Sequence, residues 1–229
     1  MKAYSSEEII TLTRQVACGK LAPTLAHKAK NILMPLTGYV ELIEAGGISP
    51  VKVKEYYKKI EEAGGGLQLL LKRYLRLGCP SSERLEEKIL LAEIVEDILS
   101  LFEHKLVLAK VKVEKKIGSE EAIVMANYDD LALIIGSLLF NALEAAPPGG
   151  KITLGLDKDS LMVSDDGPGV MAEIRDKIFE PFFTTKEGSL GLGLTAALLL
   201  SRRLKAELFL KGRNEFVLNL SHAQKDTRG

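Results

Sequence analysis

The sequence is poor in the features that define several protein classes. It has no tryptophan and two cysteines, Cys18 and Cys79, in 229 residues. Two thiols do not provide a disulfide framework or a cysteine-rich metal site, so we expect free thiols in a reducing compartment. No apolar run reaches the roughly 18 residues of a membrane-spanning helix, and the first residues lack a signal-peptide core. We therefore expect a cytoplasmic protein without a membrane span.

The sequence also lacks an excess of charge of either sign. Lysine and arginine together number 31, and so do aspartate and glutamate, which gives a formal net charge of zero. A polyanion partner normally requires a basic surface, so we expect no nucleic-acid binding. Hydrophobic residues make up 46% of the chain, which is enough for one large core or two small ones.

The N-terminal third has a helical pattern. Residues 5–8 have the form of a capping box, and apolar spacing predicts a helix after them that is interrupted at Gly19. Further helices are predicted over 21–44 and 51–77, with a break at 45–50. Two long helices with a short joint form an antiparallel hairpin. Such a hairpin buries its apolar stripe by pairing with a second copy, which predicts a homodimeric four-helix bundle.

The pattern changes after the hairpin, and we divide the chain accordingly. Residues 1–78 are assigned to the dimerisation hairpin, 79–85 to a linker, 86–221 to a second domain and 222–229 to a loose tail. The mixed order of helices and strands predicts an α+β protein whose second domain is an α/β sandwich, with helices on one face of one mixed sheet. The expected strands are 86–91, 111–117, 122–126, 151–156, 161–164, 206–210 and 215–220, and the expected helices are 92–106, 129–146 and 191–204.

Four motifs in the second domain carry the functional argument. They are Asn-Ala-Leu-Glu-Ala-Ala-Pro-Pro-Gly-Gly at 141–150, Ser-Asp-Asp-Gly-Pro-Gly-Val at 164–170, Ile-Phe-Glu-Pro-Phe-Phe-Thr-Thr-Lys at 178–186, and Gly-Leu-Gly-Leu-Thr at 191–195. Each is weak alone. In this order and spacing they resemble the N, G1, F and G2 boxes of the histidine-kinase ATP-binding domain, a member of the GHKL (Bergerat-type) superfamily.

The resemblance implies an ATP site with Mg²⁺. Asn141 stands on an otherwise apolar or small helix face, and its counterpart in the family holds Mg²⁺, which prefers hard oxygen donors. Asp165 corresponds to the residue that accepts a hydrogen bond from the adenine amino group, and Gly167 and Gly169 let the backbone pass close to the base.

The F and G2 motifs are expected to close over the phosphates. In the family the phenylalanines of the F box anchor a lid, and a helix that begins at the G2 box offers free N–H groups to phosphate. The residues assigned to this part of the ATP site are Phe182, Thr184, Thr185, Lys186, Gly191, Leu192, Gly193 and Leu194.

A histidine in the hairpin is the expected phosphoryl acceptor. The segment Leu-Ala-His-Lys-Ala-Lys-Asn-Ile-Leu-Met-Pro-Leu at 25–36 resembles the family's His box, so we assign His27 as acceptor. Neutral imidazole is the nucleophile. Asn31 lies one turn later on the same helix face and corresponds to a residue that can orient water for dephosphorylation. Position 28, usually an acid, is Lys28, which removes the presumed base.

The sequence thus predicts a histidine kinase that moves the ATP γ-phosphoryl group to His27 and then to an aspartate of a response-regulator receiver domain. A separate sensor protein is a further expected partner. One alternative is a dimeric histidine phosphotransfer protein with a degenerate ATP-binding domain, which Lys28, Ser137 and Ser189 favour. Another is an anti-sigma-type serine kinase, which would share the nucleotide fold without needing the His27 hairpin.

Overall fold

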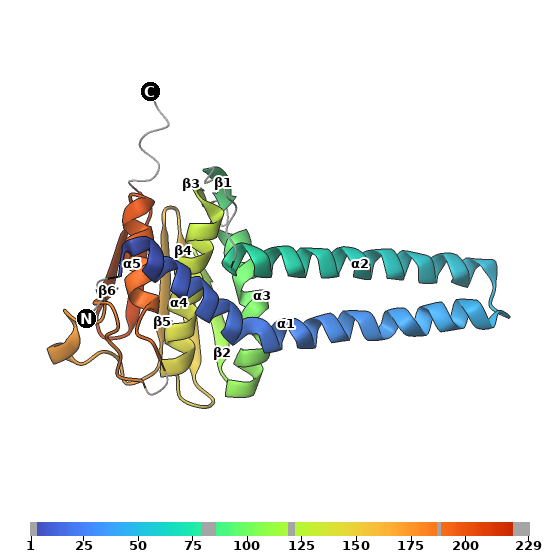
Figure 1. Cartoon of the computed structure of the whole chain (residues 1–229), viewed down its shortest axis with the longest axis horizontal. Helices are drawn as coiled ribbons and strands as arrows, with labels where there is room; N and C mark the ends of the chain where they lie inside the picture. The colour runs from blue at the N-terminus through green and yellow to red at the C-terminus, as the bar shows by residue number, and fades with distance from the viewer. Residues whose placement is uncertain (1–3, 79–85, 119–121, 187–188, 222–229) are drawn as a thin grey trace, which may run out of the picture.

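The structure, a computed structural model, describes residues 4–78, 86–118, 122–186 and 189–221. A helical hairpin projects from an α/β domain (Figure 1). The predicted linker at 79–85, the tail at 222–229 and Cys79 lie outside the described residues, and the Cys18 thiol lies 3.8 Å from the Tyr74 carbonyl oxygen. The domain boundaries drawn from the sequence therefore stay predictions. None of the helices in the described ranges has the length and apolar character that a bilayer crossing needs.

The hairpin consists of α1 (Ser6–Ala45) and α2 (Pro50–Gly78). The predicted capping box is confirmed, because Ser5 Oγ accepts from the Glu8 amide at 3.2 Å and Glu8 Oε2 accepts from the Ser5 amide at 2.8 Å. The predicted interruption at Gly19 is wrong. A helical glycine costs only about 1 kcal/mol against alanine, and buried Ala17 and Leu21 on either side hold the helix in place.

The second domain contains one five-stranded sheet and a separate small one. The strand order is β2-β4-β5-β7-β6, with β2 and β4 parallel and the other neighbours antiparallel. Strands β1 and β3 form a two-stranded antiparallel sheet of their own, so the expectation of one sheet is corrected. The strands are β1 (Glu87–Leu90), β2 (Lys112–Ile117), β3 (Ile123–Ala126), β4 (Lys151–Asp157), β5 (Ser160–Asp165), β6 (Glu207–Lys211) and β7 (Glu215–Asn219).

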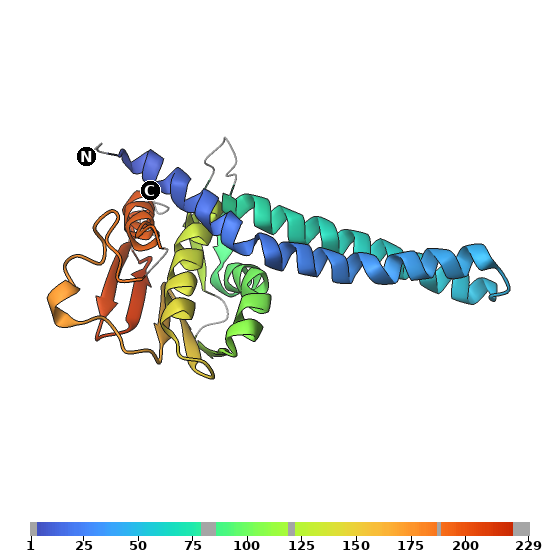
Figure 2. The ribbon, with the colours of Figure 1, turned by 60° about the horizontal axis from the view of Figure 1, so that its bottom comes forward.

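Three helices form the layer between the five-stranded sheet and α1 (Figure 2). They are α3 (Leu91–Ala109), α4 (Tyr128–Ala145) and α5 (Gly193–Arg203), and a short 3₁₀ helix, η1 (Ala172–Ile174), precedes the lid motif. Helix α4 is the centre of the core, with Leu131, Ile134, Ile135 and Leu138 fully buried. The predicted α+β fold is confirmed, and the sequence did not indicate η1.

The first four turns of α1 lie on the α/β domain. Ile9, Ile10 and Leu21 are buried there, and Arg14 reaches Asp130 at the start of α4. The guanidinium Nη2 lies 2.8 Å from Asp130 Oδ1, with both side chains about 5% exposed or less. Nη1 of the same guanidinium donates to the Asp129 carbonyl at 3.1 Å. A buried ion pair therefore fixes α1 on the domain.

Arg14→Ala leaves buried Asp130 with only its longer ion pair to Arg203, at 3.4 Å, and loss of one partner of a buried pair typically costs about 3–5 kcal/mol. We expect Arg14→Ala to lower the free energy of unfolding by roughly that amount, measured by urea titration. Arg202→Ala is the control, because Arg202 is an exposed arginine of α5 and its loss should cost about 0.5 kcal/mol or less. Equal losses in the two variants would contradict a stabilising role for the buried pair.

Candidate functional site

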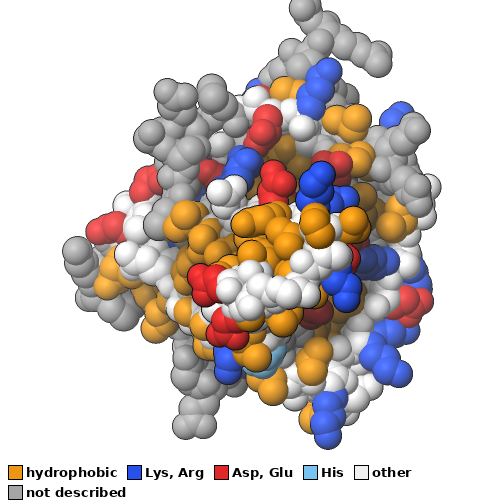
Figure 3. Space-filling model, turned by 90° about the vertical axis from the view of Figure 1, so that its right-hand side faces the viewer, with side chains coloured by type: hydrophobic (Ala, Val, Ile, Leu, Met, Phe, Trp, Pro, Cys, Tyr) orange, Lys and Arg blue, Asp and Glu red, His pale blue; other side chains and the backbone are white. Residues whose placement is uncertain are grey.

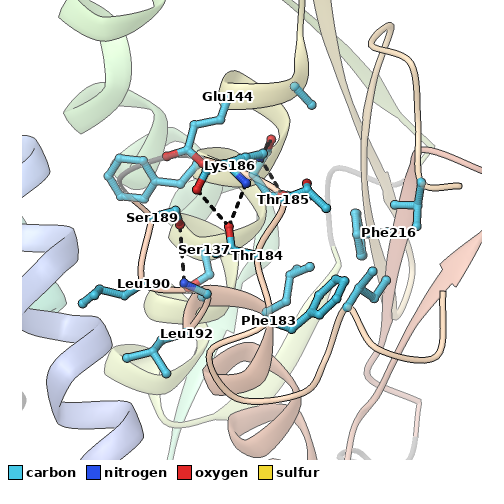
Figure 4. Close-up of a pocket in the computed structure, with 18 of the residues that line it drawn as sticks. Ser137, Glu144, Phe183, Thr184, Thr185, Lys186, Ser189, Leu190, Leu192 and Phe216 are labelled. Carbon is cyan, nitrogen blue, oxygen red and sulfur yellow. Dashed lines mark hydrogen bonds and ion pairs between the residues drawn. The ribbon is translucent and has the colours of Figure 1, made fainter. Parts of the chain in front are cut away.

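The four motifs of the second domain surround one pocket of about 370 Å³. It lies between α4, the end of β5, residues 183–186 and the start of α5, with α1 along one side (Figure 4). Ten of the twelve residues assigned to the ATP site from the sequence line it: Asn141, Asp165, Gly169, Thr184, Thr185, Lys186, Gly191, Leu192, Gly193 and Leu194. Gly167 and Phe182 do not line it.

Strand β5 carries Asp165 into one end of this pocket. Residues Leu161, Val163 and Asp165 alternate on the buried side of the strand, so strand periodicity directs the carboxylate inward. Asp165 Oδ1 accepts from the Gly167 amide at 2.9 Å. Burial raises the pKa of Asp165, and the Gly167 hydrogen bond and the charge of Lys186 partly oppose this. The apolar neighbours Ile178 and Phe216 complete a site suited to a flat base with one polar edge.

Gly167 supports this arrangement from outside the pocket. A Cβ at this position would lie 2.4 Å from the Ala145 carbonyl oxygen and 2.7 Å from Asp165 Oδ1. Glycine is therefore required where the loop after β5 passes the end of α4. By contrast, Asp166 is exposed, and its Oδ2 accepts from the Lys151 amide at 2.9 Å, as a residue that stabilises a turn does.

The other end of the pocket is polar and basic. Lys186 Nζ donates to Asn141 Oδ1 at 3.0 Å and lies 3.3 Å from Glu144 Oε2. Thr184 Oγ1 accepts from the Lys186 amide at 3.0 Å, which shapes the lid backbone (Figure 4). Asn141 and Glu144, one helical turn apart, present a neutral oxygen and a carboxylate, the oxygen donors that Mg²⁺ uses together with substrate phosphates. The residues present therefore fit the metal.

The backbone of the lid motif (178–186) is hydrogen-bonded to that of the glycine-rich motif (191–195). Phe182 donates its amide to the Gly191 carbonyl at 3.0 Å. Gly191 has φ of +64°, and a Cβ there would lie 2.5 Å from the Phe183 carbonyl oxygen, so only glycine fits. Phe182 has φ of +66°, and its ring is exposed against Tyr4, with 5.2 Å between ring centroids. Its neighbour Phe183 lines the pocket instead.

His27, the acceptor predicted from the sequence, lies outside this pocket, on an exposed part of α1. The amide nitrogen of Asn31 is 3.4 Å from His27 Nδ1. The His27 ring stacks on that of His104 from α3, with ring centroids 4.5 Å apart. Beside them Lys28 Nζ lies 2.5 Å from Glu103 Oε2, also on α3. The hydrogen bond and charge of Lys28 lower the pKa of Glu103, so a carboxylate pairs with the residue that follows His27.

Comparison with known proteins identifies the domain and its setting. The family model described as "Histidine kinase-, DNA gyrase B-, and HSP90-like ATPase" matches residues 126–224. Sporulation kinase D of Bacillus subtilis (strain 168) is 32% identical over 184 residues, which are 77% of this chain and 35% of that protein. The chain carries a histidine kinase transmitter region. It spans about a third of the length of this sporulation kinase.

Two further similarities agree with the transmitter assignment. The sensory histidine kinase/phosphatase NtrB of Klebsiella oxytoca is 28% identical over 207 residues, 84% of this chain and 58% of that protein. The nucleotide-free catalytic domain of histidine kinase ThkA matches with a TM-score of 0.52 and 27% identity, over 58% of this chain and 93% of that domain. The fold and the pocket of the transmitter region thus have relatives among histidine kinases.

Sequence reasoning missed several residues of the transmitter's pocket. Glu144 follows Asn141 by three residues, so helical spacing alone could have indicated it. The sequence analysis assigned Phe182 to the site, but Phe183 lines the pocket. The sequence does not show which of two adjacent rings a turn directs inward. The pocket residues contributed by α1, which are Thr13, Val16, Ala17 and Lys20, had no signal in the sequence, because helix periodicity does not identify the surface that a helix covers.

Proposed function

We propose that this chain is a histidine kinase transmitter that transfers the γ-phosphoryl group of ATP, with Mg²⁺, to His27 and then to an aspartate of a response-regulator receiver domain. The observation that carries the proposal is a pocket with a buried carboxylate at its apolar end and Asn141 with Lys186 at its polar end, next to a helix that bears His27. Catalysis of this type depends mainly on positioning and on charge stabilisation of the transferred group.

Each part of the pocket has a role in this reaction. Asp165 accepts a hydrogen bond from the adenine amino group, while Asn141 contributes an oxygen to Mg²⁺. Lys186 and the amides at the start of α5 face the phosphates, because the first turn of a helix has free N–H groups and a positive dipole end. Bound Mg²⁺ neutralises phosphate charge. The imidazole of His27 attacks the γ-phosphorus, and ADP leaves with the bridging oxygen.

The acid missing at position 28 has a spatial substitute. Glu103 of α3 pairs with Lys28, while the next residue, His104, stacks on His27. A carboxylate thus stands beside the acceptor although it is not adjacent in sequence. Asn31 contacts Nδ1 of His27 and not Nε2, which holds the ring by one nitrogen. This arrangement favours a kinase over the phosphotransfer protein with a degenerate ATP-binding domain, which would lack a reason to keep an acid here.

Transfer requires an arrangement other than the one in this structure. Lys20 is the last residue of α1 that lines the pocket, and His27 follows it by two helical turns, or about 10 Å along the axis. Reacting atoms must approach to about 3–3.5 Å. Either the ATP-binding domain moves along α1, or the nucleotide of a second subunit serves His27.

A second subunit is part of the proposal. Large apolar side chains are exposed along both helices of the hairpin beyond the α/β domain, among them Met34 at 61%, Val51 at 76% and Tyr57 at 58%. Figure 3 looks at the hairpin from its tip, where hydrophobic side chains gather between charged ones. Pairing with the hairpin of another copy would bury this surface in a four-helix bundle.

We expect sedimentation equilibrium to show a dimer at micromolar concentration. Tyr57→Glu should shift the protein toward monomer, because it places a charge in the apolar contact. Leu108→Glu is the control, since Leu108 is an equally exposed apolar residue, at 70%, on α3. A monomeric wild-type protein with an intact hairpin would exclude the proposed bundle.

The acceptor is tested with γ-labelled ATP and Mg²⁺. Phosphohistidine is expected, so the label should be acid-labile, base-stable and absent from His27→Ala. His104→Ala should still be labelled, because its ring only stacks on the acceptor. Label that persists in His27→Ala would remove His27 as the acceptor. Wild-type protein that takes label from a phosphorylated receiver but not from ATP would instead support the phosphotransfer alternative.

The adenine reader is tested by comparing two neighbouring carboxylates. Asp165→Asn should weaken ATP binding by about 1–3 kcal/mol, because it presents a mispaired amide inside a buried contact. Asp166→Asn should have little effect, since Asp166 is exposed and bonded to the Lys151 amide. Isothermal titration calorimetry with ATP measures both. Similar losses in the two variants would show that the adenine reader has been misassigned.

A further inference from the structure

Helix α1 forms one wall of the nucleotide pocket. Thr13, Val16, Ala17 and Lys20 line it together with residues of the α/β domain. Their spacing of three, one and three residues places them on one side of the helix. Thr13 Oγ1 also lies 3.4 Å from the carbonyl oxygen of Leu192, in the glycine-rich motif. The pocket is therefore completed by a helix from the other part of the chain.

The charged member of this wall is Lys20. Its Nζ lies 2.6 Å from Glu144 Oε1 and 5.1 Å from the centroid of the Phe140 ring. The second oxygen of the same carboxylate lies 3.3 Å from Lys186 Nζ, and Lys186 also donates to Asn141 Oδ1. One ammonium group from α1 and one from the lid segment thus converge on Glu144, next to the Asn141 end of the pocket.

The charges at this end of the pocket do not balance. The ammonium groups of Lys20 and Lys186 lie 2.6 Å and 3.3 Å from the two oxygens of the single carboxylate of Glu144. The remaining positive charge suits an anion, and the lysine side chain on its flexible stem can turn from a carboxylate to a phosphate oxygen.

We propose that Lys20 is a phosphate-binding residue of the nucleotide site, so that ATP bridges the α/β domain and α1. The proposal rests on the ATP binding proposed above. Lys20 contacts the phosphates and not the adenosine. Its loss therefore weakens the binding of ATP and leaves the binding of adenosine unchanged. Because coupling between two binding events is reciprocal, bound ATP in turn strengthens the docking of α1.

The test measures the affinities of ATP with Mg²⁺ and of adenosine by calorimetry. Lys20→Met keeps an unbranched apolar side chain and removes the ammonium group, with its ion pair to Glu144 and its contact with the Phe140 ring. We expect its ATP affinity to fall about tenfold or more, as for loss of a charge-assisted hydrogen bond, with adenosine affinity unchanged. Lys20→Arg should retain most of the ATP affinity. Lys30→Met, at an exposed lysine farther along α1, should equal wild type.

The possible outcomes separate this inference from the proposed function. If wild type and Lys20→Met bind ATP equally, the inference is overturned and the proposed function stands. If the affinities of Lys20→Met for ATP and for adenosine fall to the same extent, Lys20 acts only by maintaining the structure of the pocket. That result also overturns the inference. If the wild-type protein does not bind ATP, the proposed function itself fails.

Discussion

The buried ion pair between Arg14 and Asp130 determines the path of α1, and both functional regions depend on that path. Two charges in a dry contact each lose several kcal/mol of hydration, and they are tolerated only while paired. Because α1 is one helix from the pair to Lys20 and His27, fixing Arg14 on α4 positions a wall of the pocket and His27, the proposed acceptor, together. In this conformation the position of the hairpin is thus set by its contact with the α/β domain.

Most of the fold could be predicted because its signals are local. Strand β5 alternates buried and exposed residues, so both the strand and the inward direction of Asp165 follow from periodicity. The capping box at Ser5 marks the start of α1 in the same way. The break expected at Gly19 failed because tertiary packing of Ala17 and Leu21 outweighs a glycine's weak helix propensity.

The candidate site was predictable where motifs carry it and unpredictable where packing does. Asn141 and Lys186 meet, as their motifs indicate. The contribution of Lys20 depends on where α1 docks, which no pattern within α1 specifies. The pairing of Lys28 with Glu103 has the same origin. Position 28 departs from the family pattern, and in the structure Lys28 pairs with a carboxylate on a different helix, that of Glu103 on α3.

The continuity of α1 has a geometric consequence. Thr13, Lys20 and His27 follow one another at intervals of seven residues, and an α-helix turns by only about 20° relative to a straight line over each such interval. The three side chains therefore lie along one side of the helix, with Pro23 between Lys20 and His27. A twist of α1 about its own axis, applied at its N-terminal end, would turn the pocket wall and His27, the proposed acceptor, in the same direction. The contact of α1 with the nucleotide and the exposure of His27 would then change together.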